Sequence, residues 1–194
     1  MAPRWLDPIL LLAERINRSR VGVRPIRRGG ILGLEVTRYH GQPRQLADGT
    51  LVRDGAPIGR VHLLNDRIRP IAKVGWQREG WRVGEDDLIA LAAWWSAQPA
   101  ARRPLAFRAT TIHGPLAARA GFELQARPQT PKARLDDWWM RWLLVHYGLA
   151  GRARLRRGHG PLESVDAWLS AASLVARYGR AGGPVRPRGP DAGT

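Results

Sequence analysis

Two Asp-Gly pairs divide residues 29–65 into short segments that have the alternation of β-strands. Asp48-Gly49 is flanked by apolar residues, a pattern that favours a type I′ hairpin turn. Asp54-Gly55 repeats the signal, and residues 58–63 after it alternate apolar and polar side chains like a half-buried strand. Strands joined by such tight turns pair antiparallel, so this part of the chain predicts an antiparallel sheet.

Outside this block, apolar residues recur at helical spacing or form short runs. The hairpins are separate from the helices, so the fold class is α+β: an antiparallel sheet with hairpins, an N-terminal helix, a central helix and two C-terminal helices. Residues 64–81 show no clear pattern, and we expect an irregular segment there. The expected helices cover residues 5–17, 85–97, 115–120, 130–147 and 161–178, and the expected strands cover residues 31–39, 58–63, 105–110 and 122–126.

The length and composition fit one soluble domain over residues 1–179. Residues 180–194 are rich in Pro, Gly and Arg and are expected to be a disordered tail. The chain has no cysteine, which excludes disulfides, zinc-thiolate sites and cysteine nucleophiles. No apolar run is long enough for a transmembrane helix, and the N-terminus does not have the pattern of a signal peptide, so we expect a cytoplasmic protein.

The formal net charge of +16 favours anionic partners. Lipid head groups, glycans and phosphorylated metabolites are the candidates, and nucleic acid is a further one. No helix-turn-helix, zinc finger or RNA-binding aromatic motif supports nucleic acid. The helix expected over residues 5–17, with the basic run 18–28 after it, would suit peripheral contact with the inner membrane surface. Docking of this helix on the protein's own core is the favoured alternative.

An ordered set of short motifs identifies a family resemblance. Residues 39–41, 46–50 and 59–65 follow the patterns Y-x-G, L-x-D-G-T and G-x-x-H-x-x-N, and residues 120–123, 139–142 and 166–170 continue the set. Together they resemble the YkoP-like domain family over most of the chain, from about residue 5 to residue 178. Members of that family occur alone or fused to polysaccharide-deacetylase-type catalytic domains. The resemblance implies an accessory or ligand-binding role in cell-envelope carbohydrate or lipid metabolism, without an established activity.

His62 and Asn65 are the first candidates for chemistry. If residues 59–63 form a strand, His62 faces opposite to Val61 and Leu63. Near a sheet edge, His62 can act as an acid or base, and Asn65 can hold a substrate hydroxyl. A hydrogen-bonded structural histidine and a turn asparagine are the alternative.

A second cluster follows the strand expected over residues 105–110. Arg108, Thr110, Thr111 and His113 lie where this strand meets a short helix. Amides at a helix N-terminus bind anions, and Arg108 can add a bidentate contact, so we predict a ligand site here, with His113 as a third catalytic candidate. Capping of the helix by Thr and His is the alternative. Arg141, on the Trp-rich helix, is a further ligand-binding candidate.

Metal and cofactor motifs are missing from the sequence. The histidines are scattered without ligand spacing, and neither a Gly-x-Ser-x-Gly elbow nor a Walker-type loop occurs, so we expect no metal and no bound cofactor.

An acyltransferase is the alternative function. Residues 114–122 are similar to the late helix and Gly-Phe strand of GNAT acetyltransferases. The chain departs from the pyrophosphate-binding loop of that family, because Arg82 stands where the family's loop has its last small residue. Glu79 would also set a negative charge where a pyrophosphate must sit.

Overall fold

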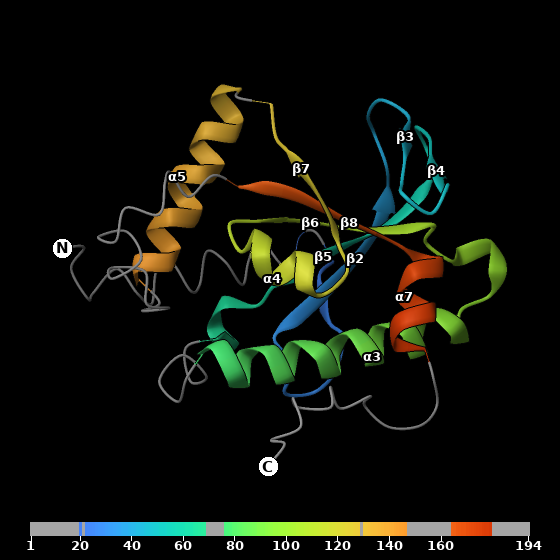
Figure 1. The fold of residues 1–194 in the computed structure, drawn as a ribbon, viewed down its shortest axis with the longest axis horizontal. Helices are drawn as coiled ribbons and strands as arrows, with labels where there is room; N and C mark the ends of the chain where they lie inside the picture. The colour runs from blue at the N-terminus through green and yellow to red at the C-terminus, as the bar shows by residue number, and fades with distance from the viewer. Residues whose placement is uncertain (1–19, 21, 69–75, 129, 147–163, 180–194) are drawn as a thin grey trace, which may run out of the picture.

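The computed structural model describes residues 20, 22–68, 76–128, 130–146 and 164–179. A six-stranded sheet in the order β1-β2-β5-β6-β8-β7 forms its centre (Figure 1). The strands are β1 (Arg24–Pro25), β2 (Leu32–Arg38), β5 (Pro57–Leu63), β6 (Ala106–Thr111), β7 (Glu123–Ala126) and β8 (Val165–Ser170), and a separate hairpin pairs β3 (Arg44–Gln45) with β4 (Leu51–Val52). The helices are η1 (Trp76–Gly80), α3 (Trp81–Ala97), η2 (Ala100–Arg102), α4 (Gly114–Arg119), α5 (Pro131–His146) and α7 (Ala171–Tyr178).

The predicted α+β class is confirmed, with mostly antiparallel pairing. The exception is the parallel pair of β5 and β6. The connection between these two strands contains the long helix α3, which returns the chain to the end of the sheet at which β5 begins. β8 then returns antiparallel to β6 and lies between β6 and β7. The only parallel pair among the described strands is therefore at the centre of the sheet.

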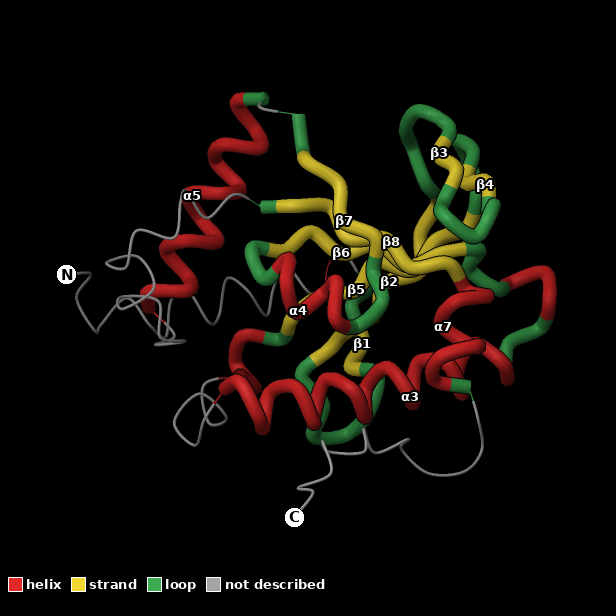
Figure 2. Tube along the Cα trace, viewed as in Figure 1, coloured by secondary structure: helices red, strands yellow, loops and turns green. Residues whose placement is uncertain are grey.

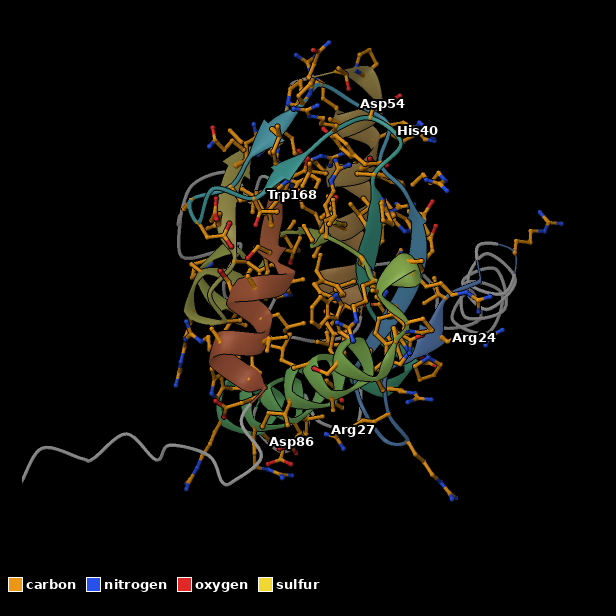
Figure 3. All side chains as sticks on the ribbon, turned by 90° about the vertical axis from the view of Figure 1, so that its right-hand side faces the viewer. Arg24, Arg27, His40, Asp54, Asp86 and Trp168 are labelled. Carbon is orange, nitrogen blue, oxygen red and sulfur yellow. The ribbon has the colours of Figure 1, made fainter. Side chains whose placement is uncertain are left out.

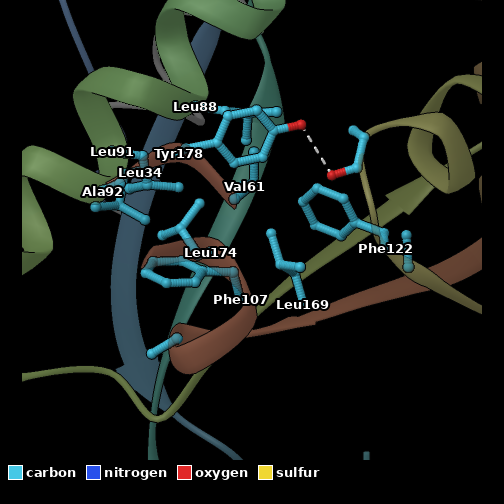
Figure 4. Close-up of a cluster of buried hydrophobic side chains, with 13 residues drawn as sticks. Leu34, Val61, Leu88, Leu91, Ala92, Phe107, Phe122, Leu169, Leu174 and Tyr178 are labelled. Atoms are coloured by element: carbon cyan, nitrogen blue, oxygen red, sulfur yellow. Dashed lines mark hydrogen bonds between the residues drawn. The ribbon is translucent and has the colours of Figure 1, made fainter. Parts of the chain in front are cut away.

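One face of the sheet packs against α3 and α7. α3 buries a helical stripe that includes Leu88 and Leu91, and α7 adds Leu174. These side chains pack on Phe107 and Leu169 from neighbouring strands (Figure 4). Burying apolar side chains of this size contributes about 1.5–3 kcal/mol each, so this layer is the main source of stability.

The β3–β4 hairpin covers one end of the other face. Trp168 lies beside this hairpin (Figure 3), and its ring meets Tyr39 edge to face at a centroid distance of 5.5 Å. The hairpin turn was expected to be type I′, which is wrong. Leu46 bonds through its amide to the carbonyl of Thr50, so three residues close the loop, with Gly49 at a φ of 86°. A three-residue loop that ends in a glycine of positive φ is another common hairpin connection.

The helix predicted over residues 161–178 is wrong in its first half. Residues 165–170 form β8, which lies between β6 and β7, and the helix begins only at Ala171. β8 is buried on both faces, so its apolar residues show no alternation that would distinguish a strand from a helix. Ser170 marks the change, because its Oγ accepts a hydrogen bond from the Ser173 amide at 2.9 Å and caps α7.

The irregular segment predicted over residues 64–81 is also partly wrong. A helical turn covers residues 65–68, and the π-helical turn η1 leads directly into α3, which starts at Trp81 rather than at Glu85. The short edge strand β1 was not predicted. The helix expected over residues 5–17 and the tail 180–194 lie outside the described residues, and the domain boundary at residue 179 stays a prediction. In the part of the chain that the structure describes, no helix has the length and apolarity to cross a membrane.

Candidate functional site

The two parallel strands at the centre of the sheet separate along their length. β5 and β6 pair from Ile58 and Ala106 to Arg60 and Arg108, and no further. β5 nevertheless continues its ladder with β2 as far as Leu63, and β6 continues its ladder with β8 as far as Thr111. Within the described part of the chain, the facing edges of residues 61–63 and 109–111 therefore have no partner strand. The sheet is split at this end.

An apolar pocket with a volume of about 150 Å³ adjoins the split. Val61 and Leu63 contribute its β5 wall, and Ala109 and Thr111 its β6 wall. Leu88 of α3 and Ala117 of α4 also line the pocket, and α4 lies above α3 in the view of Figure 2. An apolar pocket between diverging strands suits the apolar end of a ligand.

His62 lies on the opposite, polar face of the split. Its Nε2 is 3.0 Å from Oε2 of Glu35, and Arg60 is 3.4 Å from the same oxygen. Because a carboxylate only accepts hydrogen bonds, Nε2 carries the proton and Nδ1 is the acceptor nitrogen. Burial is the main cause that lowers the pKa of His62, and Arg60 adds to it, while Glu35 opposes the shift. His62 is therefore a neutral imidazole near pH 7, the form that a general base requires.

Arg108 and Thr110 lie on β6 across the split from His62. Both bind the buried carboxylate of Asp166, Arg108 through Nη2 at 2.7 Å and Thr110 through Oγ1 at 2.9 Å. The guanidinium of Arg108 also stacks over the ring of Trp168, with Cζ 5.3 Å from the centroid. His62 and Thr110 thus border the polar side of the split.

The other predicted residues are distributed around this centre or lie away from it. Thr111 and His113 line the pocket, and Thr111 Oγ1 accepts a hydrogen bond from the His113 amide at 2.9 Å. Asn65 is half-buried in the helical turn directly after β5. Arg141 is on α5, which contributes no described residue to the pocket. The roles assigned to these residues stay predictions.

Glu79 was expected to repel an anionic ligand near the start of α3. Its carboxylate is instead paired with Arg82, Nη2 to Oε1 at 2.6 Å and Nε to Oε2 at 3.1 Å. These hydrogen bonds are the main cause that lowers the pKa of Glu79. The pairing offsets the negative charge and leaves Arg78 as an exposed cation. Because η1 continues into α3, the first amides of α3 are not the free end of a helix.

Sequence reasoning missed the acidic partners of the site. Glu35 and Asp166 are buried acids on β2 and β8, and each contacts a predicted candidate on a neighbouring strand. In the sequence, each of these acids is a charged residue inside an apolar segment. The contacts of Glu35 with His62 and of Asp166 with Thr110 could not be inferred, because they depend on the order of the strands in the sheet. Among the described residues, no group of side chains has the composition of a metal site.

The sheet is mostly antiparallel and opens between two parallel strands beside an apolar pocket. The protein is therefore an α+β domain whose sheet is split at its centre. The sequence model of the YkoP domain family matches residues 4–178, so the chain belongs to that family. No curated protein and no solved structure matches the chain.

Proposed function

We propose that this chain binds an acyl thioester of the coenzyme A type in the split and transfers its acyl group. The observation that carries the proposal is the separation of β5 and β6 beyond Arg60 and Arg108, beside an apolar pocket. The unpaired strand edges offer N–H and C=O groups to an extended ligand that contains amides, as the pantetheine arm does. The net positive charge of the chain suits the phosphates of such a ligand.

The segment that is similar to GNAT acetyltransferases agrees with this location. α4 ends at Arg119, Gly121 adopts a φ of 89°, and β7 follows from Glu123. Leu116 and Phe122 of this segment line the pocket. The predicted acyltransferase and the pocket thus depend on the same part of the chain.

His62 supplies the proton acceptor in this proposal. The nucleophilic nitrogen or oxygen of the acceptor attacks the thioester carbonyl carbon, and its proton passes to Nδ1 of His62. The C–S bond then breaks with its electron pair on sulfur, and the thiolate takes up the proton held by His62 and leaves as the thiol. Glu35 holds the Nε2–H of His62 and stabilises the imidazolium that forms.

A thermal-shift titration with acetyl-CoA tests the binding step, with inorganic pyrophosphate as the control for charge alone. A ligand at about 100 times its Kd should stabilise the fold by roughly 2.7 kcal/mol. Ala117→Phe fills the pocket and should abolish the shift, whereas Ala118→Phe, exposed on the same helix, should keep it. No shift with acetyl-CoA, or a shift that Ala117→Phe leaves unchanged, would refute the proposal.

Release of free thiol from acetyl-CoA tests the transfer step. The chain has no cysteine, so a thiol reagent reports only the product. Binding without turnover would favour the other prediction, an accessory ligand-binding domain of cell-envelope carbohydrate or lipid metabolism. Nucleic-acid binding rests on charge alone, and a steep salt dependence of DNA affinity would be its support.

Contact with the inner membrane surface, which the predicted cytoplasmic location would allow, is a second candidate function, favoured by α5. Leu135, Trp138 and Trp139 are 64%, 59% and 38% exposed on this helix. Asp137 is buried and contacts Arg127, and Asp136, which is 40% exposed, also contacts Arg127. An exposed face with tryptophans, on a helix whose Asp136 and Asp137 are paired with Arg127, suits the surface of an anionic bilayer. Trp138→Ser should weaken sedimentation with phosphatidylglycerol vesicles, and unchanged sedimentation would exclude α5.

A further inference from the structure

Two arginines are paired neighbours at the point where the sheet splits. Arg60 on β5 and Arg108 on β6 are the last register pair before the strands part. Neighbouring residues of paired strands project from the same face, so the two guanidinium groups share the polar face. Like charges directly opposite one another destabilise a sheet. Acids on the flanking strands are therefore needed to compensate this repulsion.

The acids near these arginines lie on the outer sides of the pair. Glu35, on β2, is 3.4 Å from Arg60 Nη1, and Asp166, on β8, binds Nη2 of Arg108. Each carboxylate engages one nitrogen, and the buried Nε of Arg108 has no hydrogen-bond partner. The side chains of Arg60 and Arg108 remain 49% and 32% exposed. Both arginines thus keep exposed side-chain surface on the polar face beyond their contacts with the acids.

A third cation lies on the same face. Arg44, on β3, stacks over the ring of Trp168, with Cζ 5.2 Å from the centroid. Trp168 is the register neighbour of Arg108 on β8. Within the described part of the chain, the buried Nε of Arg44 has no hydrogen-bond partner. Arg44 therefore adds a third guanidinium to this face, on which Glu35, Asp166 and Glu123 are acids of the neighbouring strands.

We propose that Arg60 and Arg108 bind the anionic group, a carboxylate or phosphate, of the acyl acceptor. Guanidinium groups recognise both anions with two parallel hydrogen bonds. His62 and Thr110 lie two residues further along the same strands, on the order of 7 Å away. The acceptor is accordingly a small molecule with its amine or hydroxyl several bonds from its anionic group. The anion site stands on its own geometry, and the assignment to an acceptor rests on the proposed function.

Anion binding is tested first, without any thioester. Inorganic phosphate replaces chloride at constant ionic strength, and the shift in melting temperature gives an apparent Kd. Arg60→Gln should weaken phosphate binding at least about fivefold, roughly 1 kcal/mol, whereas Arg102→Gln, an exposed arginine on η2 with the same charge change, should not. Arg108→Lys keeps a partner for Asp166 and should weaken binding as well. Equal phosphate affinities of the Arg60→Gln and Arg102→Gln proteins would overturn the site.

The acceptor assignment is tested with matched amines. Ethanolamine, phosphoethanolamine and β-alanine are compared as acceptors from acetyl-CoA by thiol release. Phosphoethanolamine or β-alanine should exceed ethanolamine in kcat/KM by about tenfold or more, and Arg60→Gln should remove this preference. Transfer without preference for an anionic amine would refute the inference and leave the acyltransferase intact. Failure of acetyl-CoA to bind would refute the acyltransferase, and the phosphate titration would still decide the anion site.

Discussion

Asp87 and Arg27 form an ion pair that ties α3 to the loop before β2, with Arg27 Nε 2.6 Å from Asp87 Oδ1. Oδ2 of Asp87 accepts hydrogen bonds from the amides of Ile31 and Leu32 at 2.7 and 2.8 Å. A Cβ on Gly30 would lie 2.1 Å from Oδ1, so only glycine leaves room for the carboxylate. Ile31 and Leu32 line the pocket, so this buried contact fixes one of its walls.

Asp87→Ala should lower the free energy of unfolding by roughly 3–5 kcal/mol. The substitution removes the acceptor of two amides and the buried partner of Arg27, and breaking a buried pair costs about this much. Urea unfolding measures the change. Asp86→Ala is the control, because Asp86 is 45% exposed and also contacts Arg27, and its loss should cost less than about 1 kcal/mol. Similar costs for both variants would show that Asp87 does not hold α3 in place.

Gly84→Ala should stabilise the protein and weaken its ligand binding. Gly84 is inside α3, where glycine costs about 0.5–1 kcal/mol relative to alanine, and the nearest atom to an added Cβ is Ile31 Cδ1 at 3.8 Å. The residue also lines the pocket, so a methyl group narrows it. We expect a higher melting temperature and a Kd for acetyl-CoA raised by roughly three- to tenfold, about 1 kcal/mol.

Ala93→Gly is the reverse control on the exposed side of the same helix. It should lower stability by about 0.5–1 kcal/mol and leave the Kd unchanged. A stabilised Gly84→Ala protein with unchanged acetyl-CoA affinity would place the ligand elsewhere.

Local sequence signals predicted the elements whose two sides differ. Asp48-Gly49 located the β3–β4 hairpin, whereas Asp54-Gly55 lies between β4 and β5, which do not pair. The stripe of Leu88 and Leu91 located α3, because this helix has one buried and one exposed side. β8 has no exposed side: Trp168 and Leu169 are adjacent, point to opposite faces and are both buried. The apolar residues Val165, Trp168 and Leu169 therefore fit helical spacing as well as a strand buried on both faces, and the segment was predicted as a helix.

The candidate site was predicted as parts but not as a whole. His62 and Thr110 were chosen on separate segments, and only the crossover through α3 places their strands side by side. The split depends on where the β5–β6 ladder stops, which is a property of register and not of composition. Glu35 and Arg60 were missed for the same reason, because their contacts join strands whose pairing the sequence does not show.

His62 should make stability depend on pH below about 6.5. Burial is the main cause that lowers the pKa of His62 in the folded protein; Arg60 also lowers it, and Glu35 raises it. The unfolded chain therefore binds this proton more readily than the folded protein does. The stabilisation is present above the unfolded pKa of about 6.5 and is lost as the pH falls through the folded pKa. Urea unfolding at pH 7.5, 6.5 and 5.5 should show decreasing stability, and His62→Gln should reduce the slope.

His40→Gln controls for the loss of any histidine, because His40 is 78% exposed. The His40→Gln protein should show the same dependence of unfolding free energy on pH as the wild-type protein. A flat profile for the unchanged protein, or the same slope in the His62→Gln protein, would show that His62 is not a buried neutral base.

Asp48, in the L-x-D-G-T motif, should stabilise the fold through α7 rather than through its own turn. Its Oδ2 accepts hydrogen bonds from Oγ of Ser170 and of Ser173, at the start of α7, and its Oδ1 accepts one from the Thr50 amide at 3.0 Å. Burial acts to raise the pKa of Asp48, but these hydrogen bonds outweigh it and lower the pKa. The contribution is present above the unfolded pKa of about 3.9 and is lost as the pH falls through the folded pKa.

Asp48→Asn should therefore cost about 1 kcal/mol at pH 7, a figure already reduced for the exposure of the turn, and should flatten the acid limb of the stability profile. The second Asp-Gly turn provides the matched control. Asp54→Asn changes an acid that is 70% exposed and contacts only His40 among the described side chains, so its effect should stay within a few tenths of a kcal/mol. Because both residues precede a glycine of positive φ, equal effects would mean that Asp48 acts only as a turn residue. A larger effect at Asp48 would mean that the motif holds the hairpin on α7, over Trp168 and beside the arginine pair.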